Sequence, residues 1–183
     1  NPSFEANNYT VFPGYASGNG GAISGWTVSP ATRVGLNPAS SSPFADNGAT
    51  PAGNNVAFIQ SIGNSPSTLS TIITNLTPGT QYQVTFRANA RASSGVTGPT
   101  WSLNNGAAIP FTASPAWGGT NPYYTNSALF TATASIATLA LTNQSSDDST
   151  VLVDDFRIMA HPSLSNWKVY AWTDDRSTGL DPI

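Results

Sequence analysis

Hydrophobic and polar residues alternate most regularly over residues 80–91. The positions on one side of this stretch are apolar or small: Tyr82, Val84, Phe86, Ala88 and Ala90. The positions on the other side are polar: Gln81, Gln83, Thr85, Arg87, Asn89 and Arg91. A period of two predicts a β-strand that has one face in an apolar core and the other face open to water.

The polar face of this strand carries two of the six cationic side chains of the chain, although only 8% of all residues are charged. An ordinary solvated strand face is the simpler interpretation. The alternative is a row of hydrogen-bonding groups directed at a polar ligand. The strand alone leaves both interpretations open.

Further short segments of β-type pattern recur along the chain, separated by turn-forming residues. They cover residues 1–5, 23–29, 32–36, 55–62, 69–75, 100–104, 107–112, 127–134, 137–143 and 150–158. No stretch combines a helical period with capping signals. The pattern therefore predicts an all-β sandwich or barrel.

Local signals refine this picture. Phe4 is expected to anchor the first segment in the core, and Pro78-Gly79 fits the centre of a type II turn. The expected core aromatics are Trp26, Phe58, Phe86, Phe111, Phe130 and Phe156, whereas the place of Trp101 stays open. The long loop 37–53, in which Asp46 is the only charged residue, is expected to be functional or held by a ligand or an ion.

Composition narrows the function. A length of 183 residues fits one domain with a tail, and the net charge of −3 argues against binding to nucleic acid or to an anionic membrane surface. No apolar run approaches the ~20 residues that cross a bilayer. Cysteine is absent, which excludes disulfides and thiolate chemistry, while 16 glycines and 14 prolines are typical of many-turned secreted β proteins.

Several segments taken together resemble a known family. They are NPSFE, ISGWTV, NNVAFIQ, LSTIITNLTPGTQYQVTFRANAR, ALFTATASIATLALTN and TVLVDDFRI. The chain is similar over about residues 1–159 to bacterial carbohydrate-binding modules of the galactose-binding-like β-jelly-roll type. A fibronectin type III domain shares the LTPGT turn and strand, but it is shorter than the span between NPSFE and VDDF.

This resemblance implies a β-sandwich jelly roll for residues 1–159, with residues 160–183 as a C-terminal tail, a linker or the beginning of a following module. It also implies a structural Ca²⁺ ion where the first and last strands meet. Glu5, Asp154 and Asp155 occupy the matching positions, and Ca²⁺ takes hard oxygen ligands of this kind. Asp154 is expected to share a strand face with Leu152 and Phe156. In the alternative without a metal, Asp154 caps backbone amides or pairs with Arg157, and Asp155 is solvated.

The resemblance further implies sugar binding, for which aromatic rings stack on pyranose faces and polar side chains bind hydroxyl groups. The candidate polar groups are Gln83, Arg87, Asn89 and Arg91 on the strand at residues 80–91. The candidate rings lie in loops: Tyr9, Phe12, Tyr15, Trp117, Tyr123 and Tyr124. Either a groove on the sheet or the loops at one end could hold the sugar, and at least one ring is expected to be exposed.

Catalysis is not expected. A glycosidase needs two carboxylates about 5–10 Å apart across the sugar, and Glu5 is the only glutamate. The only histidine, His161, is expected at the surface, because the sequence offers no nucleophile elbow or cysteine with which it could form a triad. A catalytic domain would require a carboxylate pair in a cleft.

The sequence therefore predicts a secreted, monomeric, non-catalytic module that tethers a glycan-active enzyme or surface protein to a polysaccharide or oligosaccharide. Its partners would be glycan and other modules of the same polypeptide, with no nucleic acid and no membrane. The alternative is a structural or adhesive β-sandwich spacer of a cell-surface protein without a sugar site. An open groove containing Arg87, Asn89 and Arg91 beside an exposed ring would favour sugar binding.

Overall fold

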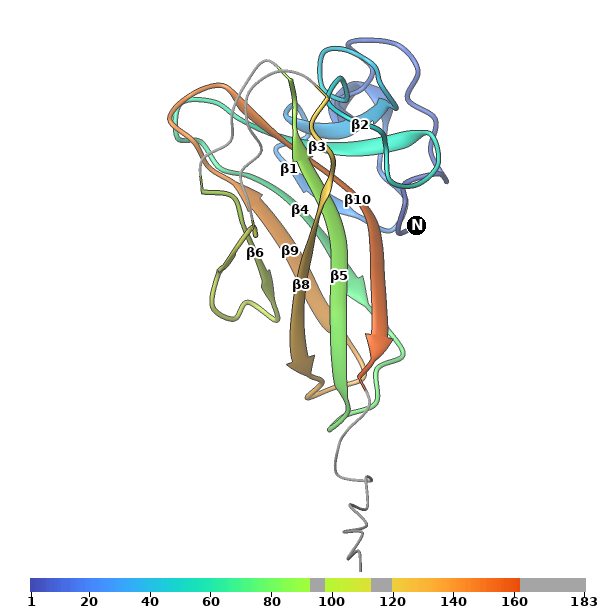
Figure 1. The fold of residues 1–183 in the computed structure, drawn as a ribbon, viewed down its shortest axis with the longest axis vertical. Coiled ribbons are helices and arrows are strands. Elements are labelled where there is room, and N and C mark those ends of the chain that lie inside the picture. Colours follow the sequence, from blue (N-terminus) through green and yellow to red (C-terminus); the bar gives the residue numbers. More distant parts are fainter. Residues whose placement is uncertain (93–97, 113–119, 162–183) are drawn as a thin grey trace, which may run out of the picture.

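The computed structural model describes residues 1–92, 98–112 and 120–161, which form two antiparallel sheets packed face to face (Figure 1). In spatial order, sheet A contains β2 (Val34–Pro38), β3 (Asn55–Ser61), β10 (Ser149–Ala160), β5 (Gln81–Ala90) and β8 (Tyr124–Thr131). Sheet B contains β1 (Thr27–Ser29), β4 (Ser67–Ile73), β9 (Ala137–Asn143), β6 (Thr100–Leu103) and β7 (Ile109–Pro110). The prediction of an all-β sandwich is confirmed.

The first residues depart from the predicted pattern. Residues 1–5 form turns instead of a strand, and Phe4 has a φ of 64°, which no β-strand accommodates. Phe4 is nevertheless fully buried, as expected of a core anchor. A single helical turn, α1 (Ser17–Gly20), was not expected from the sequence. In the described part of the chain, no helix is long and apolar enough to cross a membrane.

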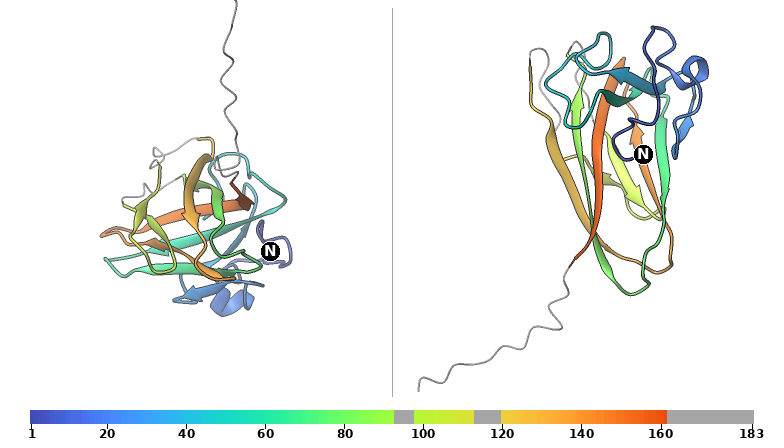
Figure 2. Two further views of the ribbon diagram at one scale, coloured as in Figure 1. Left: turned by 90° about the horizontal axis from the view of Figure 1, so that it is seen from below. Right: turned by 90° about the vertical axis from the view of Figure 1, so that its right-hand side faces the viewer.

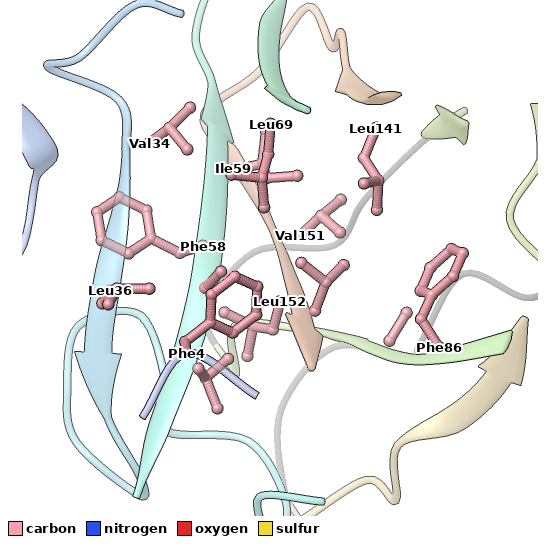
Figure 3. Packing of buried hydrophobic residues seen from close by; sticks show 14 of the residues in the cluster. Phe4, Val34, Leu36, Phe58, Ile59, Leu69, Phe86, Leu141, Val151 and Leu152 are labelled. Atoms are coloured by element: carbon pink, nitrogen blue, oxygen red, sulfur yellow. The ribbon is translucent and has the colours of Figure 1, made fainter. Parts of the chain in front are cut away.

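The core lies between the two sheets. Leu69 and Leu141 of sheet B face Val151 and Phe86 of sheet A across this space (Figure 3). Trp101, whose place the sequence left open, is buried and meets the ring of Phe86 edge-on at 5.2 Å between centroids. Interlocking of large side chains from both layers is what excludes water from a sandwich of this kind.

Strand β5 lies between β10 and β8 and follows the predicted alternation. Val84, Phe86 and Ala88 face the core, while Thr85 and Arg87 lie on the outer face of sheet A. The turn before β5 also agrees with the sequence, because Gly79 has a φ of 84° and a type II turn requires a positive φ at that position.

Strand β10 contains a β-bulge that the sequence did not reveal. Its register against β5 shifts between Asp154 and Arg157, and Asp155 has a φ of 52°. The bulge changes the alternation of side chains along the strand. Asp154 therefore lies opposite Arg87 in the strand register, on the outer face, while Phe156 points into the core. The prediction that Asp154 and Phe156 share a face is therefore wrong, because one extra residue separates them.

A long loop from residue 39 to residue 54 covers the upper part of the outer face of sheet A, where β2 and β3 lie (Figure 1; Figure 2, right). Phe44 of this loop stacks on Phe58 of β3 at 4.0 Å between ring centroids. The lower part of the same face, formed by β10, β5 and β8, is not covered by this loop. The edge of the loop over these three strands positions the candidate site.

Candidate functional site

The loop 39–54 is tied to the strands beneath it by buried polar groups. The Asn47 Nδ2 atom donates to the Ala90 carbonyl at 2.8 Å, and the Asn89 Nδ2 atom donates back to the Asn47 carbonyl at 2.8 Å. Asp46 Oδ1 accepts a hydrogen bond from the Ala92 amide at 2.9 Å. These bonds satisfy loop backbone and side-chain groups that burial would otherwise leave unpaired, and they fix the loop as one wall of a depression.

We call this depression the Arg87 groove. One part has a volume of about 680 Å³ and is lined by Ser40, Asp46, Gly48, Ala49, Pro51, Arg87, Thr120, Pro122 and Tyr123. The adjoining part has a volume of about 410 Å³ and is lined by Pro51, Thr85, Phe86, Arg87, Thr125, Asp155 and Arg157. Pro51 and Arg87 belong to both parts, so the groove runs along the outer face of sheet A past Arg87.

The polar chemistry of the groove centres on Arg87. Its Nη1 atom donates to Thr125 Oγ1 on the neighbouring strand β8, which orients the guanidinium group. No carboxylate among the described residues forms an ion pair with Arg87, since the ion pairs there join Arg91 with Asp148 and Arg157 with Asp155. The remaining donors of a guanidinium group of this kind are available for hydroxyl, carboxylate or phosphate oxygens of a ligand.

Two acidic groups share the groove with Arg87. Asp155 binds Arg157 through both of its carboxylate oxygens, at 3.0 Å each, so this end of the groove carries a neutralised pair. Asp46 lies in the other part and uses Oδ1 for the Ala92 amide. The groove therefore offers a cationic donor and an anionic acceptor that are not paired with each other, an arrangement that suits neighbouring hydroxyl groups, because a hydroxyl both donates and accepts.

Tyr123 provides the aromatic part of the wall. Only 6% of the residue is exposed. Burial, followed by the negative charges of Asp154 and Asp46, raises its pKa well above the usual range. The phenol therefore keeps its proton at all physiological pH values and acts as a neutral hydrogen-bonding and packing surface.

The four polar residues predicted to contact sugar do not all lie in the groove. Arg87 lines the groove, and Gln83 lies further along the same outer face, where its Nε2 atom donates to Ser127 Oγ at 3.0 Å. Asn89 is only 1% exposed, because the loop 39–54 covers it and its amide serves that loop. Arg91 forms an ion pair with Asp148 at 3.0 Å, and its side chain is 14% exposed. Asn89 and Arg91 thus hold the scaffold in this structure and are not open to a ligand.

The aromatic residues predicted to contact sugar also do not all lie in the groove. Tyr123 lines the groove, and Tyr124 is partly buried against the core at the beginning of β8. Tyr15 is buried beside β2, at the opposite edge of sheet A from β8, and does not line the groove. Trp117 lies outside the described residues. Phe12 is exposed, but it does not line the groove.

Several groove residues were not among the predicted contacts: Asp46, Pro51, Thr85, Thr120, Thr125 and Arg157. Asp46 carried a usable signal, because it is the only charge in the loop 37–53. Thr85 shares the polar face of the strand with Arg87, and this position also follows from the alternation. Thr125 and Pro51 come from distant segments, so no local pattern connects them with Arg87.

The predicted cation ligands Glu5 and Asp154 lie near each other below the loop 39–54. Glu5 Oε1 accepts hydrogen bonds from the Asn54 and Asn55 amides at 2.9 and 2.8 Å. Asp154 accepts from the Ala52 amide at 2.8 Å and from the Asp155 amide at 2.7 Å. Asp155 instead turns toward Arg157, as the bulge in β10 directs its side chain into the groove.

Asp154 has an unusual electrostatic environment. Its side chain is fully buried, and burial is the main cause that raises the pKa to about 7. The two amide donors lower the pKa, whereas the charges of Asp155 and Glu5 raise it further. A buried carboxylate close to two other acids and without a cationic partner among the described residues fits a site that a cation would neutralise.

Acidic side chains would supply only some of the oxygen ligands of a Ca²⁺ ion at this site. Across the residues that the structure describes, no cluster of three or more His, Cys, Asp or Glu side chains could hold a metal. Glu5 and Asp154 would therefore need backbone carbonyl oxygens to complete the six to eight oxygen ligands that Ca²⁺ takes. The loop 39–54, whose amides donate to both carboxylates, is a candidate source of such oxygens.

The fold is shared with proteins of known structure. The architecture is the β-sandwich jelly roll of carbohydrate-binding modules, as the sequence resemblance predicted. It matches TmCBM61 in complex with β-1,4-galactotriose with a TM-score of 0.52 and 15% sequence identity, covering 88% of this chain and 96% of the other.

Within this fold, the chain belongs to the HpiC1-like family, whose model, described as HpiC1 cyclase, matches residues 1–113. A comparison with curated proteins finds no match.

Two larger proteins contain a similar domain. An exo-β-agarase matches with a TM-score of 0.53 and 12% identity over 83% of this chain. The enzymatically active domain of tailspike protein 4 of bacteriophage CBA120 matches with a TM-score of 0.53 and 16% identity over 80% of this chain. This chain spans only 25% of the agarase chain and 21% of the tailspike domain. At these identities the similarity shows a common fold.

Proposed function

We propose that this chain is a non-catalytic domain that holds a polysaccharide or oligosaccharide in the Arg87 groove. The single observation that carries the proposal is the arrangement of Arg87, Asp46 and Tyr123 around one cavity of about 680 Å³. Arg87 donates hydrogen bonds, Asp46 accepts them, and Tyr123 supplies a rigid aromatic wall. Volumes of this size are typical of ligand sites with a few fixed polar groups.

The proposed domain tethers other modules of a secreted polypeptide to glycan and acts as a monomer. The groove is open along the sheet, so a sugar chain could lie over β10, β5 and β8 beside Arg87 and Gln83. Affinity is expected between roughly micromolar and millimolar, or about −4 to −8 kcal/mol. We further propose that a structural Ca²⁺ ion held by Glu5, Asp154 and loop carbonyl oxygens stabilises the groove wall, with Asp155 as a further candidate ligand.

The test is affinity electrophoresis of the chain in gels that contain a panel of plant and microbial polysaccharides. The Arg87→Ala variant is compared with Arg33→Ala, which removes the same charge close to β2 and away from the groove. Loss of a charge-assisted hydrogen bond costs about 1.5–3 kcal/mol, so retardation by the cognate glycan should weaken roughly tenfold or more in Arg87→Ala only. Equal retardation of both variants would refute the groove as the sugar site.

A structural spacer is the second candidate function. The observation that favours it is the internal use of Asn89 and Arg91, which the loop 39–54 and Asp148 engage. In that case no polysaccharide of the panel retards the chain, and Arg87→Ala changes neither binding nor folding. If a glycan retards the unmodified chain, and if both Asp46→Asn and Arg87→Ala abolish this retardation, the spacer function is refuted.

A further inference from the structure

A second cavity lies on the other side of sheet A, between the two sheets. Its volume is about 280 Å³, and apolar side chains from both layers supply most of its lining: Trp26, Ile72, Ile73, Val84, Leu139, Phe156 and Ile158. We call it the Trp26 cleft. Apart from Arg157 at its rim, it shares no polar residue with the Arg87 groove.

The Trp26 cleft exists because two strands end early at this side of the sandwich. β3 pairs with β10 only from Ser149 to Val153, and β1 pairs with β4 only from Thr68 to Ser70. The lower halves of β10 and β4 therefore have a neighbour on one side only, β5 and β9 respectively, and the sandwich stays open between their free edges. The first residues of the chain lie beside this opening (Figure 2, right), and the Phe156 amide donates to the Pro2 carbonyl at 3.0 Å.

The opening exposes apolar surface that a closed sandwich would bury. Ile72 at the mouth is 61% exposed, and Ile158 on the opposite side is 37% exposed although its side chain faces inward. Deeper in the cleft, the rings of Trp26 and Phe156 lie 4.8 Å apart at an angle of 56°, and together they form an aromatic wall. Exposed apolar surface of this kind is stabilised when an apolar ligand covers it.

The polar side chains around the cleft are already bonded within the protein. Trp26 Nε1 donates to the Asn1 carbonyl at 3.0 Å, and Thr71 Oγ1 donates to the Gly25 carbonyl at 2.7 Å. The Asn1 side chain binds the Ala6 amide and the Ser24 carbonyl. Arg157 is held by Asp155. A sugar or a charged molecule would lose its hydration in this cleft and gain no hydrogen bonds in return.

The volume indicates the size of the occupant. A dry apolar cavity of about 150 Å³ holds one benzene ring, and the Trp26 cleft is almost twice as large. Two fused rings would fill it. A rigid ring system also loses less conformational entropy on binding than a flexible chain of similar volume.

We propose that the Trp26 cleft binds a small, uncharged molecule built on two fused aromatic or alicyclic rings. This site is independent of the Arg87 groove, from which sheet A separates it. The aromatic wall of Trp26 and Phe156 stacks on the ligand, while Ile73, Leu139 and Val84 form the floor. Recognition depends on shape and apolar contact alone.

The experiment titrates naphthalene into the whole chain with the isoleucine δ1 methyl groups labelled for NMR. The expected result is a saturable shift of the Ile73 and Ile158 methyl resonances, whereas Ile136, which is exposed elsewhere, stays unchanged. Galactose should shift neither of the cleft resonances. Absence of a saturable shift up to the solubility limit of naphthalene would overturn the proposal.

Two matched variants separate filling of the cleft from loss of folding. Ile158→Trp places a large ring in the cleft and should abolish the Ile73 shift. Met159→Trp changes the next residue, which is 56% exposed and lies on the opposite face of β10, and should leave the shift intact. An equal loss in both variants would refute the site.

Other occupants give different signatures in the same experiment. If a second copy of the chain covers the cleft, the Ile72 and Ile158 resonances shift with protein concentration before any naphthalene is added. That result overturns the proposal. Because Arg87→Ala leaves the cleft untouched, this variant should bind naphthalene normally, so failure of the sugar proposal and failure of this one are distinguishable.

Discussion

The buried carboxylate of Asp154 gives the sharpest prediction about Ca²⁺. Its pKa is raised from 3.8 to about 7, mainly by burial. With 1.36 kcal/mol for each pKa unit, keeping this group ionised in the folded chain costs about 4 kcal/mol. A Ca²⁺ ion that restores the ordinary pKa would recover much of this free energy.

The pKa shift fixes the direction of the pH dependence. Because the folded pKa lies above the unfolded value, protonation of Asp154 favours the folded state. In the presence of chelator, this group should therefore lower the free energy of unfolding as the pH rises from about 4 to about 7. Saturating Ca²⁺ should flatten this dependence, because the ion then compensates the charge.

The assay is thermal unfolding followed by circular dichroism, with Ca²⁺ or with chelator, between pH 4 and pH 8. At a hundred times its Kd, an ion adds about 2.7 kcal/mol to stability. For a chain of this size, that increase raises the Tm by roughly 5–10 °C. Asp154→Asn should abolish both the Ca²⁺ effect and the pH dependence, since the amide carries no charge.

Asp147→Asn is the matched control, because Asp147 is exposed at the surface. It should keep the full response to Ca²⁺. Asp155→Asn tests the remaining candidate ligand: if Asp155 only holds Arg157, this variant also responds to Ca²⁺. A Tm that chelator does not change at pH 7 would refute the ion site, and a pH dependence that survives in Asp154→Asn would refute the assignment to this carboxylate.

Three further predictions concern stability and are checked by urea unfolding. Phe86→Ala should lower the free energy of unfolding by about 3–5 kcal/mol, because its ring contacts Trp101 and Phe156 in the core; a loss under 1 kcal/mol would mean that this part of the core repacks. Asn47→Ala should cost about 2–4 kcal/mol, since it removes the bond to the Ala90 carbonyl and leaves buried groups unpaired, and it should also weaken glycan retardation. Gly79→Val should destabilise more than Gly79→Asn, because asparagine tolerates the observed φ of 84° better; the reverse order would contradict the assigned turn.

The strand at residues 80–91 illustrates what a sequence pattern can predict. The alternation correctly assigned the core face of β5, because one buried side is enough to impose a period of two. The polar side of the same strand was less informative. Arg87 reaches the groove, but Asn89 lies under the loop 39–54, where its partner Asn47 is 42 residues earlier in the sequence.

The last strand shows a second limit. The sequence predicts Asp154 on the same strand face as Leu152 and Phe156, but in the structure Asp154 is buried on the outer face, opposite Arg87. The bulge that directs the two carboxylates to different partners depends on the pairing of β10 with β5. No alternation rule predicts where an extra residue enters a strand, because the partner strand decides it.

Local patterns in the sequence thus determined the fold class, the principal strands and the core side of β5, because burial of an apolar face leaves a period in the chain itself. Tertiary structure alone decided which polar groups remain open to a ligand. Arg87 meets Asp46 and Tyr123 through packing of a loop, a central strand and a segment 36 residues later in the chain. The Trp26 cleft likewise results from where β3 and β1 end, a property of strand pairing that no single segment records.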